Sequence, residues 1–145
     1  MAILLDSGFL VLLADKGAKD HQWATEALDA TTDDVWTTEA VLTEAAAALA
    51  ELGGRAAFGL VLKLVEDDTI KIFRPLEADT GTVGRLLARN AGRQFTFATA
   101  GLVAAVDALP RATVYTTAAE LFKSLRTLAR DVVPHVAPHV APTDD

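Results

Sequence analysis

The chain has no cysteine among its 145 residues, which excludes disulfides, zinc sites built from thiolates and cysteine nucleophiles. Glycine-rich phosphate loops are absent as well, because neither GxGxxG nor GKS or GKT occurs in the sequence. No serine stands in the pattern of a nucleophile elbow. Nucleotide binding through such loops and chemistry by a Ser-His-Asp triad are therefore not expected.

Basic residues are also few. The 13 Lys and Arg residues face 20 Asp and Glu residues, and the formal net charge is −7. General coating of nucleic acid depends on basic surface and released counterions, so we expect no DNA partner of that kind. The balance still leaves room for a local basic rim around an acidic metal site, and it suits a basic segment of a partner protein.

Long apolar runs are missing too. The first apolar run is interrupted by Asp6 and Asp15 and has no basic leader. We therefore expect neither a signal peptide nor a membrane span, and we expect a cytoplasmic protein. Hydrophobic residues make up 51% of the chain, which argues against disorder, and the length suits one domain with a sizeable core.

The segment MAILLDSGFLVLL, residues 1–13, carries the strongest functional signal. A short continuous apolar run is typical of a strand buried on both faces, so residues 2–5 are predicted to form a central strand. Asp6 then lies at the carboxyl end of that strand, where open α/β sheets gather functional groups. Ser7 is placed to cap a helix that begins at Gly8. An Asp at such a junction either serves a site or only caps the helix, and the sequence leaves both open.

Apolar periodicity and turn residues predict strands that alternate with helices along the chain. Strands are expected at residues 2–5, 35–37, 69–73 and 112–115, and helices at residues 9–15, 21–30, 38–52, 55–66, 77–90, 96–109 and 120–130. This alternation predicts an α/β fold with three layers, α/β/α, around a central, mostly parallel sheet of four to five strands. The domain is expected to span residues 1–130. Residues 131–145 repeat the unit HVAP and contain three prolines, so a flexible tail is predicted there.

The alanine-rich helix after the second strand contains three glutamates that do not share one face. Glu44 lies three and four residues from the apolar Val41 and Ala48, so it is predicted to point inward. Glu39 and Glu51 are expected to face water. A carboxylate on a buried face needs a partner or a metal, which makes Glu44 a candidate functional residue.

Two further sets of residues have a functional and a structural interpretation. Three arginines near the end of the helix at residues 77–90 either bind RNA or form a solvated helix end: Arg85, Arg89 and Arg93. The histidines are expected to be structural. His21 lies in the first turn of a helix, and the prolines around His135 and His139 prevent a helix from aligning that pair as metal ligands.

The order and spacing of these segments resemble a PIN domain over residues 2–126, and more narrowly the VapC-type toxins of bacterial and archaeal toxin–antitoxin pairs. The matching segments are ILLDSGFLVLL, DHQWA, TTEAVLTEAAAAL, GGRAAFGLVLKLV, FTFATAGLVAAV and VYTTAAELF. The resemblance implies an endoribonuclease that depends on Mg²⁺ or Mn²⁺, with RNA and an antitoxin-like protein as partners. About four carboxylates at the carboxyl ends of the strands then hold cations that bind the scissile phosphate and activate a water.

In this resemblance Asp6 matches the first family carboxylate and Glu44 the second, and these two are the implied metal ligands. The third and fourth acids are replaced, because the chain has Thr99 and Ala118 at those positions. Glu120 matches a further acidic position and completes a candidate catalytic set with Asp6 and Glu44. Hydroxyl groups that supply no charge are candidates for supporting roles: Ser7, Thr116 and Thr117. Asp107 lies about 12 Å along the helix from the third position, too far to replace that acid.

Three interpretations follow from the two missing acids. The first is a PIN protein whose nuclease site has decayed and which retains binding of RNA or a partner. The second is a weak metal-dependent ribonuclease that uses Asp6, Glu44 and Glu120. The third is a toxic enzyme silenced by replacement of its acids.

A non-catalytic interaction module is a further alternative. The apolar faces at residues 45–49 and 58–65 exceed what a single three-layer domain needs, and PIN-like proteins commonly pair through this region. A homodimer is therefore expected, unless both faces belong to the internal core.

Overall fold

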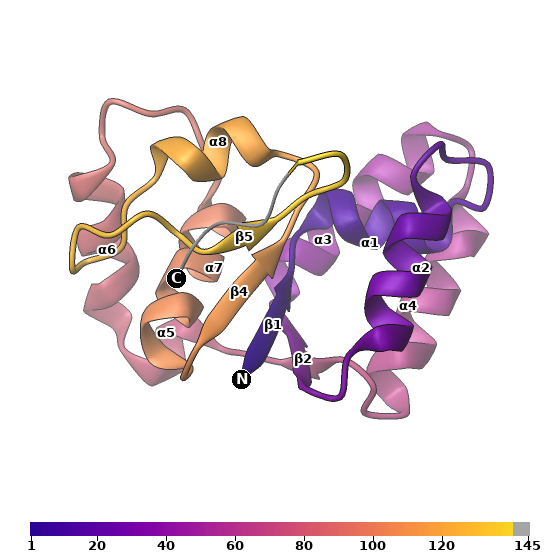
Figure 1. Cartoon of the computed structure of the whole chain (residues 1–145), viewed down its shortest axis with the longest axis horizontal. Coiled ribbons are helices and arrows are strands. Elements are labelled where there is room, and N and C mark those ends of the chain that lie inside the picture. Colours follow the sequence, from indigo (N-terminus) through magenta and orange to yellow (C-terminus); the bar gives the residue numbers. More distant parts are fainter. Residues whose placement is uncertain (141–145) are drawn as a thin grey trace.

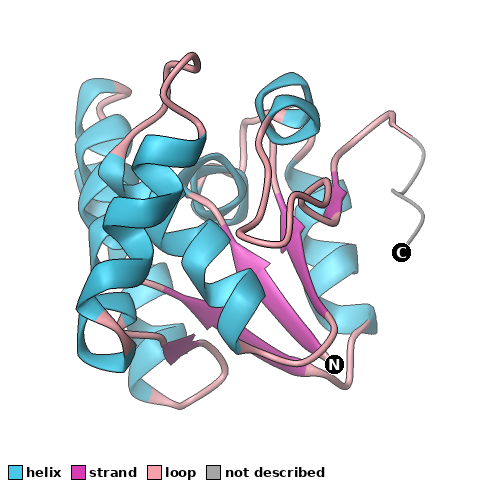
Figure 2. Ribbon diagram, turned by 90° about the vertical axis from the view of Figure 1, so that its left-hand side faces the viewer, coloured by secondary structure: helices cyan, strands magenta, loops and turns pink. Residues whose placement is uncertain are grey.

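A five-stranded sheet forms the centre of the computed structural model, which describes residues 1–140 (Figures 1 and 2). The strands lie in the order β3-β2-β1-β4-β5, and every neighbouring pair is parallel. Their bounds are β1 Ala2–Leu5, β2 Asp34–Thr37, β3 Lys71–Ile72, β4 Ala112–Tyr115 and β5 His135–Val136. The predicted α/β class with a parallel sheet is confirmed.

Helices cover both faces of the sheet and give three layers, as predicted. One group lies to the right of the strands in Figure 1: α1 Ser7–Ala14, α2 His21–Ala30, α3 Glu39–Glu51, the 3₁₀ turn η1 Arg55–Ala57, and α4 Phe58–Glu66. The other group lies to the left of the strands and above them: α5 Pro75–Ala78, α6 Thr80–Arg89, α7 Phe97–Ala108 and, at the top, α8 Ala119–Ser124.

Strand β1 lies at the centre of the sheet because all four of its side chains are apolar and are buried there. Burying one large aliphatic side chain contributes about 1.5–3 kcal/mol, so a strand of this kind is most stable between two neighbours. β1 pairs with β2 on one side and with β4 on the other. Its last residue, Leu5, pairs with Tyr115 of β4. The chain therefore leaves both strands at the same level, which places Asp6 beside Thr116.

Small side chains let α7 lie close to its neighbours. Seven of its residues are buried, and most of them are Ala or Gly. A Cβ built on Gly101 would lie 3.3 Å from Cγ of Pro75, which shows how closely α5 approaches α7. Among the helices of residues 1–140, none has the length and apolarity needed to cross a membrane.

Three predicted helix boundaries differ from the structure. The first helix begins at Ser7 rather than Gly8, because Asp6 and not Ser7 is its N-cap. The helix predicted at residues 77–90 is divided at Asp79, whose side chain accepts a hydrogen bond from the Gly81 amide and starts α6. The helix predicted at residues 120–130 ends at Ser124, because Leu125 turns into extended backbone with its side chain in the core.

The flexible tail predicted from residue 131 is wrong for the part of it that the structure describes. Strand β5, His135–Val136, adds to the edge of β4, and the Val114 amide donates to the Pro134 carbonyl at 2.9 Å. Val133 and His135 are buried. In the first HVAP unit Ala137 is buried and the buried His135 contacts Phe122 of α8, and the prolines of this segment gave no sign of this packing. The remainder of the predicted tail, residues 141–145, lies outside the described residues.

Candidate functional site

A cavity of about 310 Å³ lies at the carboxyl ends of β1 and β4. The chain runs from β1 toward β2 and β3 on one side, whereas β4 and β5 lie on the other, so this is where the strand order reverses. Ligands of open α/β sheets bind at such switch points. The cavity is lined by residues of β1–α1, α3, the loop before α7, α7 itself and the β4–α8 connection.

Asp6 is fixed by the backbone that surrounds it. Its Oδ1 accepts a hydrogen bond from the Phe9 amide at 2.9 Å, and its Oδ2 accepts one from the Thr116 hydroxyl. The side chain is only 8% exposed. The capping role that the sequence left open is therefore observed directly, and both carboxylate oxygens have protein donors.

Burial changes the chemistry of this carboxyl group. Desolvation raises the pKa of Asp6 from 3.8 to about 6, although the hydrogen bonds from Thr116 and the Phe9 amide oppose the rise. The negative charge of Glu44 adds to it. Asp6 therefore takes up a proton in mildly acidic solution, where an ordinary aspartate remains charged.

Glu44 reaches the same cavity from α3, as its predicted inward orientation requires. It is half-buried, and the Ser7 hydroxyl donates to its Oε2 at 3.4 Å. Glu39 and Glu51 are exposed, as expected. The structure thus brings Asp6, Ser7 and Glu44 together from segments far apart in the sequence.

The two positions where the resemblance expects further acids also face this cavity. Thr99 lies in the first turn of α7, where its amide donates to the Thr96 hydroxyl at 3.2 Å and the two hydroxyls are 3.3 Å apart. Ala118 follows β4, and its amide donates to the Thr116 hydroxyl at 2.7 Å. Both residues line the cavity together with Asp6 and Glu44. The fold therefore brings together the four positions at which the resemblance implies an acid, and two of them have uncharged side chains.

Glu120 does not join them. Its side chain is 90% exposed and pairs with Lys123 at 3.1 Å, and it does not line the cavity. The candidate catalytic set of Asp6, Glu44 and Glu120 is therefore not assembled in this structure. Asp107 lies at the far end of α7 and accepts a hydrogen bond from the Leu128 amide at 3.3 Å, in keeping with its expected inability to replace the third acid.

These residues fit a divalent metal poorly. Mg²⁺ and Mn²⁺ bind oxygen ligands, and their affinity depends on the number and charge of the carboxylates. Each oxygen of Asp6 already accepts a protein hydrogen bond, and the only other carboxylate of the described residues that lines this cavity is Glu44, which accepts a long hydrogen bond from Ser7. Within residues 1–140, no group of three or more His, Cys, Asp or Glu side chains is arranged to hold a metal ion.

Gly8 is a residue of the site that sequence reasoning missed. A Cβ built on Gly8 would collide with the Thr117 hydroxyl, so only glycine lets this threonine lie against the start of α1. The Thr117 amide is among the hydrogen-bond donors that lower the pKa of Asp6. The sequence held one signal for this contact, a glycine in the first turn of a predicted helix. Gln94, Phe95 and Thr96 also line the cavity, and no motif marked them.

The three candidate RNA-binding arginines are not equivalent. Arg85 pairs with Asp79 at 3.1 Å in an exposed salt bridge, whereas Arg89 is exposed at the end of α6. Arg93 donates from its Nε to the Ser124 carbonyl at 3.4 Å and directly precedes Gln94 in the cavity wall.

The histidines lie apart from the cavity. His21 binds the Leu12 carbonyl at 2.6 Å and fastens α2 to α1. His135 is buried in β5 and contacts the Phe122 ring, whereas His139 is exposed and pairs with Asp20 at 2.7 Å. The structure therefore gives no shared site to His135 and His139.

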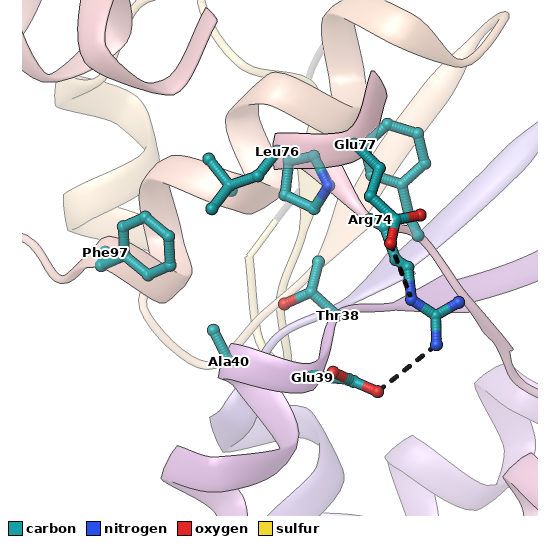
Figure 3. Close-up of a pocket in the computed structure, with 10 residues that line it drawn as sticks. Thr38, Glu39, Ala40, Arg74, Leu76, Glu77 and Phe97 are labelled. Carbon is teal, nitrogen blue, oxygen red and sulfur yellow. Dashed lines mark hydrogen bonds and ion pairs between the residues drawn. The ribbon is translucent and has the colours of Figure 1, made fainter. Parts of the chain in front are cut away.

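A second hollow, of about 250 Å³, lies beside the first turn of α7 (Figure 3). Its floor is apolar, with the half-exposed Leu76 and Phe97 on one side. At its rim Arg74 pairs with Glu39 at 3.5 Å and with Glu77 at 3.9 Å. One arginine thus faces two glutamates at the rim, while the apolar floor suits contact with an apolar side chain.

Known proteins resemble the chain in both sequence and fold. The family model of the PIN domain matches residues 3–126. The structure of VapC20 from Mycobacterium tuberculosis, a toxin that cleaves the sarcin-ricin loop, has a TM-score of 0.68 at 18% identity, over 77% of this chain and 86% of that chain. VapBC2 from Rickettsia felis, bound to a DNA fragment from its promoter, has a TM-score of 0.63 at 16% identity, over 94% of this chain and 98% of that chain. No curated protein sequence matches the chain.

Proposed function

The chain belongs to the PIN domain family, and on this basis we propose that it is a VapC-type protein that has weak or no ribonuclease activity and retains binding of RNA or of a partner protein. The observation that carries this proposal is the composition of the cavity. Asp6, Glu44, Thr99 and Ala118 all line it, and two of these four positions are uncharged.

Electrostatics explains why the loss of two acids matters. Carboxylates crowded at one site stay ionised because a cation neutralises them, and the cation is held because they are numerous. With two acids the attraction for a divalent ion falls. Asp6, with a pKa near 6, is then kept by its hydrogen bonds to the start of α1 rather than by a metal.

The remaining lining of the cavity still suits a phosphate group. The hydroxyls of Thr99 and Thr117 and the amide of Gln94 line it. Hydroxyl and amide groups donate hydrogen bonds to phosphate oxygens without a cation. These groups support binding of an RNA strand without supplying the charge that cleavage needs.

Cleavage assays test the loss of activity. The substrates are a sarcin-ricin loop oligonucleotide, named for the mycobacterial relative, and a mixed-sequence RNA, each with millimolar Mg²⁺ or Mn²⁺. We expect little or no cleavage, and we expect the wild type and Glu44→Gln to leave the same fraction of RNA intact. Efficient metal-dependent cleavage that is abolished by Glu44→Gln would contradict the proposal and favour an active enzyme.

Two features support a protein partner. VapBC2 of Rickettsia felis is structurally similar over most of both chains, and its name describes a toxin–antitoxin complex. In addition, the apolar hollow beside α7 offers Leu76 and Phe97 to a partner side chain. We propose an antitoxin-like protein as that partner, and co-purification of the chain with the product of a neighbouring small gene tests this.

A homodimer is a second candidate role, favoured by two exposed leucines of α4. Ala45 and Leu49 belong to the core, but Leu60 and Leu62 of α4 are 44% and 49% exposed. Pairing with a second copy would remove these apolar side chains from water. Sedimentation equilibrium should show a dimer that weakens in a Leu60→Ser, Leu62→Ser variant, whereas a monomer at every concentration would exclude this role.

A further inference from the structure

Charge is distributed very unevenly along this acidic chain. Residues 1–84 carry six Lys and Arg against fifteen Asp and Glu, whereas residues 85–130 carry seven against two. The second region includes the end of α6, α7, β4 and α8. In Figure 1, α6 lies to the left of the sheet and α8 lies above it. Although the protein as a whole is acidic, the segment 85–130 therefore has an excess of basic residues.

A buried asparagine joins the two helices that carry these basic residues. Asn90, which is 6% exposed, follows α6 directly. Its side chain donates to the carbonyls of Leu86 at 3.0 Å and Arg126 at 3.1 Å, and it accepts from the Arg126 amide at 2.9 Å. The end of α6 is thereby fastened to the segment that follows α8, although the two are 36 residues apart.

Two guanidinium groups converge on the end of α8 as a result. Arg93 donates from Nε to the Ser124 carbonyl at 3.4 Å. Arg126 donates from Nη1 to the carbonyls of Lys123 at 2.8 Å and Leu125 at 2.9 Å. Neither guanidinium forms a salt bridge within residues 1–140. Backbone carbonyls thus orient both groups, while their positive charge is left without an acidic partner.

The remaining donors define what these groups can bind. Arg93 keeps both terminal nitrogens and Arg126 keeps Nε and Nη2 after these contacts are made. A guanidinium with two parallel N–H groups matches a phosphate in bidentate geometry. Lys123 adds a third cation beside them, only partly offset by its exposed pair with Glu120.

The position of this cluster indicates a nucleic-acid strand rather than an acidic peptide. Gln94 and Phe95, directly after Arg93, line the cavity at the switch point, as do Leu121 and Phe122, directly before Lys123. A strand whose phosphates lie on the cluster would therefore run into the cavity. We propose that Arg93, Lys123 and Arg126 form a metal-independent binding site for the phosphate backbone of single-stranded RNA. This inference rests on the proposed retention of RNA binding, and it names the surface that provides it.

Fluorescence anisotropy with a labelled single-stranded RNA of mixed sequence, in EDTA at several salt concentrations, tests the inference. Because each phosphate contact to a single strand contributes about 0.7 to the slope of log K against log salt, three contacts give a slope of about −2. The Arg93→Gln, Lys123→Gln variant should lower the affinity roughly tenfold at low salt and reduce the slope to about −0.7. The Arg55→Gln, Lys63→Gln variant removes the same charge from exposed residues of η1 and α4, and its affinity should match the wild type.

The outcomes separate this site from the broader proposal. Wild-type RNA binding that survives in the Arg93, Lys123 variant would overturn the site but not RNA binding itself. An equal loss in the Arg55, Lys63 control would reduce the effect to net charge and overturn the site as well. Absence of wild-type RNA binding would remove both the site and the RNA branch of the proposed function. Displacement of the RNA by polyglutamate at equal charge concentration would assign the surface to an acidic protein instead.

Discussion

The two walls of the cavity at the switch point share one fold but differ in chemistry. The wall from β1, α1 and α3 carries Asp6 and Glu44, the two acids that the resemblance assigns to the site, whereas the wall from α7 and the β4–α8 connection has Thr99 and Ala118. The topology of the backbone places all four positions in the cavity wall, whichever side chains they carry. The difference teaches that an acid can persist for a structural reason, because Asp6 caps α1 and binds Thr116.

The largest expected effect comes from making the two walls alike. Thr99→Asp with Ala118→Asp should restore a four-carboxylate site, because both side chains line the cavity. Without metal, the added charge repels Asp6 and Glu44 and lowers the melting temperature. With metal at 100 times its dissociation constant, the variant should gain about 2.7 kcal/mol of stability. Thermal melts with and without Mn²⁺ measure the change in melting temperature. If Mn²⁺ does not raise the melting temperature of the variant, the missing charge alone does not explain poor metal binding.

The next effect is the pH dependence of stability at Asp6, which separates the capping role of this side chain from its charge. Its pKa is raised from 3.8 to about 6, so the folded protein holds the proton more tightly than the unfolded chain. This contribution to stability is present below about pH 4 and is lost as the pH rises through about 6. Asp6→Asn keeps a capping oxygen and carries no charge, so its stability relative to the wild type should increase by about 2 kcal/mol from about pH 4.5 to about pH 7.5.

Urea unfolding at both pH values measures that difference. A constant difference between Asp6→Asn and the wild type would mean that Asp6 is ionised throughout, as expected for a carboxylate that a nearby cation or unseen donor stabilises.

The contact between the walls should have an effect of similar size or smaller. Gly8→Ala places a methyl group against the Thr117 hydroxyl, and overpacking of this kind costs about 1–3 kcal/mol. Thr117→Ala should relieve most of that cost in the double variant, and a double-mutant cycle by urea unfolding measures the coupling. Additive effects would show that the two side chains do not meet.

The smallest effect is expected at Glu120, outside both walls. Its exposed pair with Lys123 contributes less than about 0.5 kcal/mol, so Glu120→Gln should leave the unfolding free energy nearly unchanged. It should also leave any residual RNA cleavage unchanged. If Glu120→Gln abolished cleavage, the carboxylate would have to reach the cavity in a conformation other than the one described here.

Much of the fold was predictable because its signals are local. The apolar run of β1 and the small residues of α7 predicted buried elements, and the order of strands and helices predicted a parallel sheet. The helix predicted at residues 120–130 failed because Asn90, distant in sequence, binds the backbone of Arg126 and holds it outside a helix. Strand β5 was missed for a related reason, since its stability comes from pairing with β4 rather than from its own sequence.

The site was predictable only where a residue type is chemically conspicuous. Acids at a strand end and on an apolar helix face identified Asp6 and Glu44, and the resemblance identified Thr99 and Ala118. Gly8 and the cluster around the end of α8 depend on contacts between distant segments. Such contacts have no signature in a single sequence.

Binding of Mn²⁺ to the wild-type protein tests the central claim most directly. Isothermal titration at neutral pH should give no heat of specific binding at submillimolar metal, because the cavity offers a capped, hydrogen-bonded Asp6 and one other carboxylate. Saturable binding with a micromolar dissociation constant that disappears in Glu44→Gln would contradict the account.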